Sequence, residues 1–295
     1  MDNKKLVALG CLFAIALMLG TVVLGFLSVP DSESGERTVS LNIYKNNSLD
    51  IRISGIKDSL AYLPNGAATV QYMKSSSGVP DISGTAVTGV LEAYVYSMMP
   101  TEDGSYSLST DNVVMYNLAD PENAQMTINS TVQYYAGYAV LPLGENRYAV
   151  PGTPTIVGST YGVLNTLAVI GGASSPQSLF NDIASHITTY DADYEILTVS
   201  GSGFEQYYES NGVSADGTHV AELLFLNIDG ALKEQLIDTL ESDASGVPYQ
   251  ADEFDDGVFK LMISAPSSES FDSVMLAVSG TISEYAATVD ASTAA

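Results

Sequence analysis

An uninterrupted apolar stretch near the start of the chain, residues 6–28, constrains the sequence more than any other feature. It reads LVALGCLFAIALMLGTVVLGFLS and follows Lys4 and Lys5. About 20 apolar residues at 1.5 Å per residue match the ~30 Å hydrocarbon core of a bilayer. The sequence therefore predicts a transmembrane helix over 6–28, with the rest of the chain on one side of the membrane.

The charges that flank this stretch predict its orientation. Two lysines precede it, whereas Asp31, Glu33 and Glu36 follow it, so the positive-inside rule places residues 1–5 in the cytoplasm. A cleavable signal peptide is the alternative, but its apolar core is shorter, roughly 7–15 residues. We therefore expect a retained signal-anchor, and a single-pass protein of the cell membrane whose C-terminal domain is extracytoplasmic.

The composition limits what the exterior part can do. The chain has 35 acidic and 10 basic residues and a net charge of −25, and it has no cluster of Lys and Arg that could bind nucleic acid. Its single cysteine, Cys11, lies inside the apolar stretch, which excludes a disulfide framework in the exterior. This composition is similar to that of archaeal envelope and surface-layer proteins. Two glycosylation acceptor patterns, Asn46-Asn47-Ser48 and Asn129-Ser130-Thr131, fit an exported chain.

Residues 29–37 are polar and lack periodicity, so we expect a stalk. A first α+β unit is predicted over 38–150. Its expected elements are a hairpin over 38–44 and 49–54, a helix over 85–98, and strands over 68–74, 112–116 and 132–141.

A second α+β unit is predicted over 151–287, followed by a frayed tail over 288–295. Its expected strands are 154–158, 195–200, 220–228 and 257–264, and its expected helices include 176–190, 229–240, 267–286 and a short one over 204–210. This order is that of a ferredoxin-like (split βαβ) unit. The predicted fold is therefore α+β, with one or two ferredoxin-like units after the transmembrane helix. An internal duplication is left open by the shared triplets Gly89-Val90-Leu91 and Gly162-Val163-Leu164.

Three segments carry a resemblance to a known family. They are Leu63-Pro64-Asn65-Gly66 before a strand, Pro154-Thr155-Ile156-Val157-Gly158-Ser159 before a helix, and Ser178-Leu179-Phe180-Asn181-Asp182. Over residues 60–201 the chain resembles an uncharacterised family of membrane-anchored prokaryotic, archaeal-type envelope proteins with Leu-Pro-turn repeats. The resemblance implies anchoring and architecture, and it implies no activity and no functional residue.

The search for catalytic groups gives one enzymatic alternative. A Ser/His/Asp-type hydrolase needs a base, and the chain offers His186 and His219. No G-x-S-x-G motif occurs, since Ser159 lies one position early between Gly158 and Gly162. A packed or edge histidine is the favoured interpretation of His186, and a loop or strand-start residue that of His219, so we predict no catalytic residue.

An acidic loop gives the candidate metal site. Asp252, Glu253, Asp255 and Asp256 offer the oxygen ligands that calcium prefers. The loop is not an EF-hand, because Phe254 stands where that motif has its third-position ligand. A solvated acidic turn is the alternative, so no cofactor is expected other than calcium.

The 18 tyrosines give the candidate contact residues, with local groups at Tyr134, Tyr135, Tyr138, Tyr207 and Tyr208. Tyrosine suits half-buried strands, and it can also stack on a glycan or an envelope protein. The leading prediction is a non-catalytic binding or structural protein of the cell envelope, anchored in the membrane. An exported hydrolase and a calcium-stabilised surface module are the alternatives.

Overall fold

A computed structural model of the protein describes residues 36–75, 89–98, 112–144, 146–188, 191–199, 201–242 and 246–293. The predicted transmembrane stretch and most of the stalk lie outside these residues. Within the described part of the chain, no helix is both long and apolar enough to cross a membrane.

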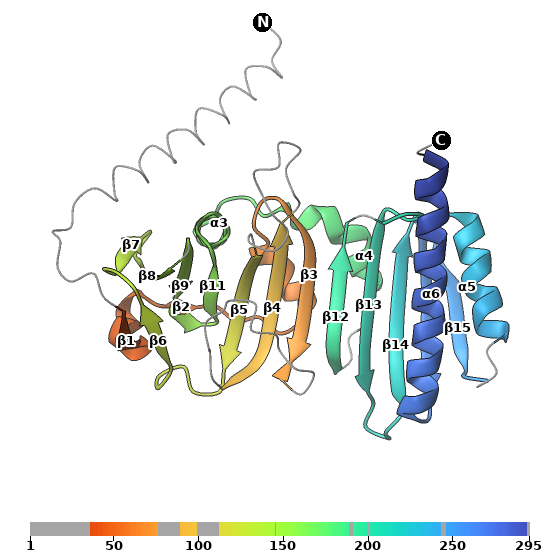
Figure 1. Ribbon diagram of the computed structural model, residues 1–295, viewed down its shortest axis with the longest axis horizontal. Coiled ribbons are helices and arrows are strands. Elements are labelled where there is room, and N and C mark those ends of the chain that lie inside the picture. Colours follow the sequence, from red (N-terminus) through yellow and green to blue (C-terminus); the bar gives the residue numbers. More distant parts are fainter. Residues whose placement is uncertain are drawn as a thin grey trace, which may run out of the picture.

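A twelve-stranded sheet runs through the whole domain, and every neighbouring pair in it is antiparallel (Figure 1). In spatial order its strands are β15 (Tyr249–Glu253), β16 (Val258–Ala265), β14 (His219–Leu226), β13 (Gln206–Val213), β12 (Ala192–Thr198), β3 (Ala67–Lys74), β4 (Val90–Met98), β5 (Asn112–Leu118), β11 (Thr155–Ser159), β9 (Arg147–Val150), β8 (Tyr138–Gly144) and β7 (Gln133–Tyr135).

Helices and two small strand pairs cover this sheet. The helices are η1 (Leu41–Asn47), α2 (Ile56–Ser59), η2 (Leu60–Tyr62), α3 (Thr160–Ile170), η4 (Pro176–Phe180), α4 (Asn181–His186), α5 (Gly230–Ser242) and α6 (Ser268–Thr293). Strand β1 (Arg37–Ser40) pairs with β6 (Gln125–Ile128), and β2 (Leu49–Asp50) pairs in parallel with β10 (Gly152–Thr153).

The two faces of the sheet bury different cores. On one, which we call the α4 face, a core spans the middle of the sheet under α2, η2, α3, η4 and α4. The opposite α6 face has two cores, one under α5 and α6 at the β15 end and one under η1, β1 and β6 toward the β7 end. Because side chains alternate along a strand, Leu223 faces α6 while Leu224 faces α4, and both are fully buried.

The predicted α+β, ferredoxin-like fold is wrong, since the described chain is mostly β. The helix predicted over 85–98 is the main reason: residues 90–98 form the central strand β4, and the residues before Gly89 lie outside the described range. Residues 93–96 are buried on both faces, so apolar residues occur at nearly every position and also match a helical spacing.

Two smaller predictions are also wrong. The hairpin over 38–54 does not form: β1 pairs with β6, and 41–47 is a 3₁₀-helix. Residues 206–210 of the predicted short helix belong to β13. In both cases the partner strand lies far away in the sequence, and local patterning does not reveal it.

The long elements of the second half are confirmed. The strand predicted over 220–228 is β14, covered on both faces, and the helices predicted over 229–240 and 267–286 are α5 and α6. The two halves of the sheet also share one pairing order, β3-β4-β5-β11-β9 and β12-β13-β14-β16-β15, joined through β3 and β12. The helices that follow the last strands differ, because α3 packs on the α4 face and α6 on the other.

Candidate functional site

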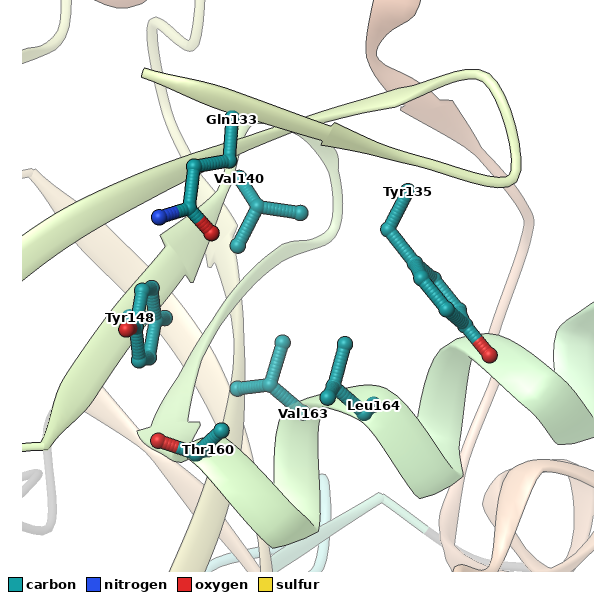
Figure 2. A pocket seen from close by; sticks show the side chains of 7 residues that line it. All are labelled: Gln133, Tyr135, Val140, Tyr148, Thr160, Val163 and Leu164. Carbon is teal, nitrogen blue, oxygen red and sulfur yellow. The ribbon is translucent and has the colours of Figure 1, made fainter. Parts of the chain in front are cut away.

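A small slot lies between the β7–β8 hairpin and the start of α3 (Figure 2). Its enclosed space is only about 10 Å³, room for roughly one water molecule and far below the roughly 300–1,000 Å³ of typical small-molecule sites. The residues that line it come from β7, β8, β9 and α3, and they are Gln133, Tyr135, Val140, Tyr148, Thr160, Val163 and Leu164.

The hairpin side of the slot follows from a tight turn. Ala136 and Gly137 have φ values of 50° and 92°, the left-handed pair that a two-residue hairpin turn needs. Alternation along β7 then points Gln133 and Tyr135 into the slot, while Tyr134 points away and is 63% exposed.

The helix side depends on a close approach between α3 and β5. Ser159 caps α3 by accepting a hydrogen bond from the Gly162 N–H at 3.1 Å. A Cβ on Gly162 would lie 2.2 Å from Val113 Cγ2, so only glycine fits at this distance. The close packing of this first turn sets where Thr160, Val163 and Leu164 line the slot.

The exposed surface of the slot is apolar, and a buried acceptor without a partner among the described residues lies beside it. Gln133 Oε1 is buried and accepts no hydrogen bond from the described residues. Figure 2 shows this amide oxygen turned toward the middle of the slot, with the Tyr148 ring on one side and the Tyr135 ring on the other. A buried acceptor without a partner carries a desolvation cost of about 1–3 kcal/mol, which a donor brought by a ligand would relieve.

A second polar feature crosses the sheet on the α4 face. Glu195, Ser210 and Glu222 are directly opposite one another on β12, β13 and β14, and all three are buried. Tyr208 donates a hydrogen bond to Glu195 Oε1 at 2.7 Å. Burial raises the pKa of Glu195, although the bonds from Tyr208 and from the Ile56 N–H oppose this rise.

Glu222 fixes the connection between α4 and β12. The N–H and hydroxyl groups of Thr188 both donate to its carboxylate, and Lys260 forms an ion pair with it. Lys260 Nζ also donates to the carbonyl of His186 at 3.2 Å, and Lys57 Nζ donates to that of Ile187 at 2.8 Å. These groups are thus used to hold the 186–188 segment on the sheet, which is a structural role.

The two histidines lie far apart in the fold. His186 Nε2 is 2.7 Å from Asp256 Oδ2, and its ring packs on Phe254. His219 packs against the ring of Phe271. Among the described residues no hydroxyl group is hydrogen-bonded to either imidazole, so the geometry gives the hydrolase alternative no support.

Three of the four candidate calcium ligands have other partners. Asp252 accepts from the Gln250 amide at 2.9 Å, Glu253 pairs with Lys233, and Asp256 pairs with His186. The described residues contain no group of three or more metal-ligating side chains. A calcium site formed by Asp252, Glu253, Asp255 and Asp256 therefore stays a prediction.

Sequence reasoning found part of the slot. The tyrosine group at 134–138 lies in this hairpin and Tyr135 does line the slot, whereas Tyr208 is fully buried. The single strand predicted over 132–141 is wrong, because a turn at 136–137 divides it into β7 and β8. Tyr148, Thr160 and Val163 were missed as site residues, because nothing in the sequence shows that β9 and α3 lie against β7. Comparisons with protein-family models, with curated proteins and with solved structures each gave no match.

Proposed function

We propose that this chain is a membrane-anchored, extracytoplasmic binding protein of the cell envelope, and that the slot between β7–β8 and α3 is its binding site. The observation that carries this proposal is Gln133 Oε1, a buried acceptor without a partner among the described residues, in an otherwise apolar slot. The predicted anchor over 6–28 supplies the location.

The size and chemistry of the slot favour a side chain of a partner protein over a free small molecule. With about 10 Å³ of enclosed space, it is far too small for a whole metabolite. Its surface is made of tyrosine rings and aliphatic groups, which suit an apolar side chain, and Gln133 would accept a bond from a nearby donor. The proposed activity is therefore recognition without catalysis.

Site-specific photo-crosslinking in intact cells tests this function. A benzophenone amino acid at Tyr135 should give a discrete crosslinked partner, and the same group at Val213, which is 45% exposed on β13, should not. Leu164→Trp, which fills the slot, should abolish the Tyr135 product while leaving the melting temperature close to that of the parent. Equal products from both positions, or insensitivity to Leu164→Trp, would contradict the proposal.

A further inference from the structure

The charges of this strongly acidic chain are distributed unevenly. After Arg147 the only basic residues in the sequence are Lys233 and Lys260, whereas most of the acidic residues lie there. Between Glu122 and Glu145 the chain has no charged residue at all. This uncharged segment includes the whole of β6, β7 and β8, so this end of the sheet carries few charges while the β15 end is acidic.

Exposed apolar, aromatic and basic side chains gather at the neutral end. Ile43 of η1 is 67% exposed and Tyr134 of β7 is 63% exposed. Arg37 at the start of β1 and Lys45 of η1 are also exposed, as is Glu36 next to Arg37. The Asn47 side chain joins η1 to the β7–β8 turn by donating to the Gly137 carbonyl at 2.7 Å.

Tyr44 links these residues into one surface. It packs against the core under β6, and the bond from Asn47 to Gly137 holds η1 beside the β7–β8 turn. Burial raises the pKa of Tyr44, while Arg37 lowers it and Tyr134 raises it further. We call Arg37, Ile43, Tyr44, Lys45 and Tyr134 the η1–β7 surface. None of its basic groups has an ion-pair partner among the described residues.

The chain reaches the predicted anchor from the same place. Arg37 begins β1 and pairs with Ile128 of β6, five residues before β7 starts. Residues 29–36 can span at most about 28 Å when fully extended, so Arg37 stays within that distance of a bilayer that holds 6–28. The β15 edge is eleven strand spacings of about 4.8 Å from β7, or roughly 50 Å across the sheet. In Figure 1, β1, β6 and β7 lie together at the end opposite to β15 and α5.

We infer that the η1–β7 surface contacts the membrane, resting on anionic lipid headgroups with the acidic β15 end directed away. This inference depends on the membrane anchoring proposed above. Tyrosine is favoured at the headgroup level of a bilayer, and a basic residue near an anionic surface adds attraction. The net charge of −25 repels the same surface, which favours the orientation that puts the acidic end farthest from it.

Single-cysteine labelling of the full chain tests the orientation, because Cys11 is the only cysteine to replace. Cys11→Ser variants carrying Ile43→Cys, Tyr134→Cys or Leu276→Cys would be labelled with an environment-sensitive dye and reconstituted into phosphatidylcholine vesicles with or without phosphatidylglycerol. Leu276 is the control, being 76% exposed on α6 near the acidic end. A headgroup spin-labelled lipid should quench positions 43 and 134 but not 276, and more strongly when phosphatidylglycerol is present. Replacing Arg37 and Lys45 by glutamine should weaken this contact about five-fold per residue.

The outcomes separate this inference from the function on which it rests. If the full chain does not float with the vesicles, the membrane anchoring itself is wrong. If it floats but positions 43, 134 and 276 are quenched equally, the anchoring stands and the orientation is overturned. A glycan found on Asn46, which is exposed within η1, would also overturn it, because the sugar would hold this surface away from the lipid.

Discussion

Lys260 and Glu222 form an ion pair between the neighbouring strands β16 and β14, on the face of the sheet that α4 covers. The Glu222 side chain is fully buried and that of Lys260 is 12% exposed, so water screens the pair very little. Thr188 supplies further bonds to the carboxylate, which makes the pair an attachment point for the segment that leads into β12.

Replacing Lys260 by methionine should strongly destabilise the fold. It leaves Glu222 as a buried carboxylate without a cation, and breaking a buried pair in this way costs about 3–5 kcal/mol. Denaturant unfolding of the full chain in detergent, followed by circular dichroism, measures this cost. The double variant Glu222→Gln/Lys260→Met should recover part of the loss, because the glutamine keeps an acceptor for Thr188 without a charge.

The Lys233–Glu253 pair is the matched control. Glu253 is 65% exposed in this pair, and an exposed ion pair contributes about 0–1 kcal/mol. Lys233→Met should therefore change the free energy of unfolding very little. If Lys260→Met costs no more than Lys233→Met, the Glu222 pair does not stabilise the fold.

Long elements with a consistent pattern were predictable from the sequence, whereas pairings between distant segments were not. The sequence predicts a central strand over 220–228 because the consecutive residues Leu223 and Leu224 are both apolar. A strand that is buried on both faces needs apolar residues at consecutive positions. The same double burial misled the prediction at β4, where Ala93, Tyr94 and Val95 also fit a helical spacing.

In the candidate site, too, local groups of residues were predictable and contacts between distant segments were not. The tyrosines at 134–138 were visible as a group, but the slot exists because Gly162 lets α3 lie close to β5, and the residue across that contact, Val113, is far away in the chain. The partners of Glu222 were likewise unpredictable, since they come from β16 and from the loop after α4.

Glu195→Gln should change how stability depends on pH. The pKa of Glu195 is raised in the fold by burial, so the folded protein binds its proton more tightly than the unfolded chain does. Relative to the variant, the parent should gain stability as the pH falls from neutral toward the ordinary carboxyl range of about 4. Denaturant midpoints of both proteins at several pH values measure the difference.

Asp256→Asn should change the pH dependence of stability in the opposite direction. The hydrogen bond with His186 lowers the pKa of Asp256, so the stability that this carboxylate contributes is present above the ordinary carboxyl range and is lost as the pH falls through its lowered pKa. Relative to Asp256→Asn, the parent should lose stability on acidification. If the stability difference between parent and variant changes with pH in the same direction for Glu195→Gln and Asp256→Asn, the pKa of Glu195 is not raised in the fold.

Gly162→Ala should destabilise the protein by about 1–3 kcal/mol, the usual cost of overpacking a core. Its new methyl group would overlap Val113, a fully buried and β-branched side chain that cannot turn away easily. Gly230→Ala is the control at the start of α5, where a Cβ has nothing within 4 Å. Thermal melts should show a lower midpoint than the parent for Gly162→Ala and an equal or higher one for Gly230→Ala. Equal midpoints for the two variants would show that α3 can shift away from β5 without cost.

Calcium should leave the melting temperature of the full chain unchanged. Consecutive side chains of a strand point to opposite faces, so Asp252 faces the α4 side of β15 while Glu253 faces the α5 side, where it pairs with Lys233. One ion cannot be held by both, and Asp256 is already paired with His186. Melts in excess calcium and in excess chelator test this expectation. A midpoint that rises with calcium, and no longer rises in an Asp255→Asn variant, would instead establish the loop as a calcium site, because calcium requires several carboxylate oxygens to converge on it.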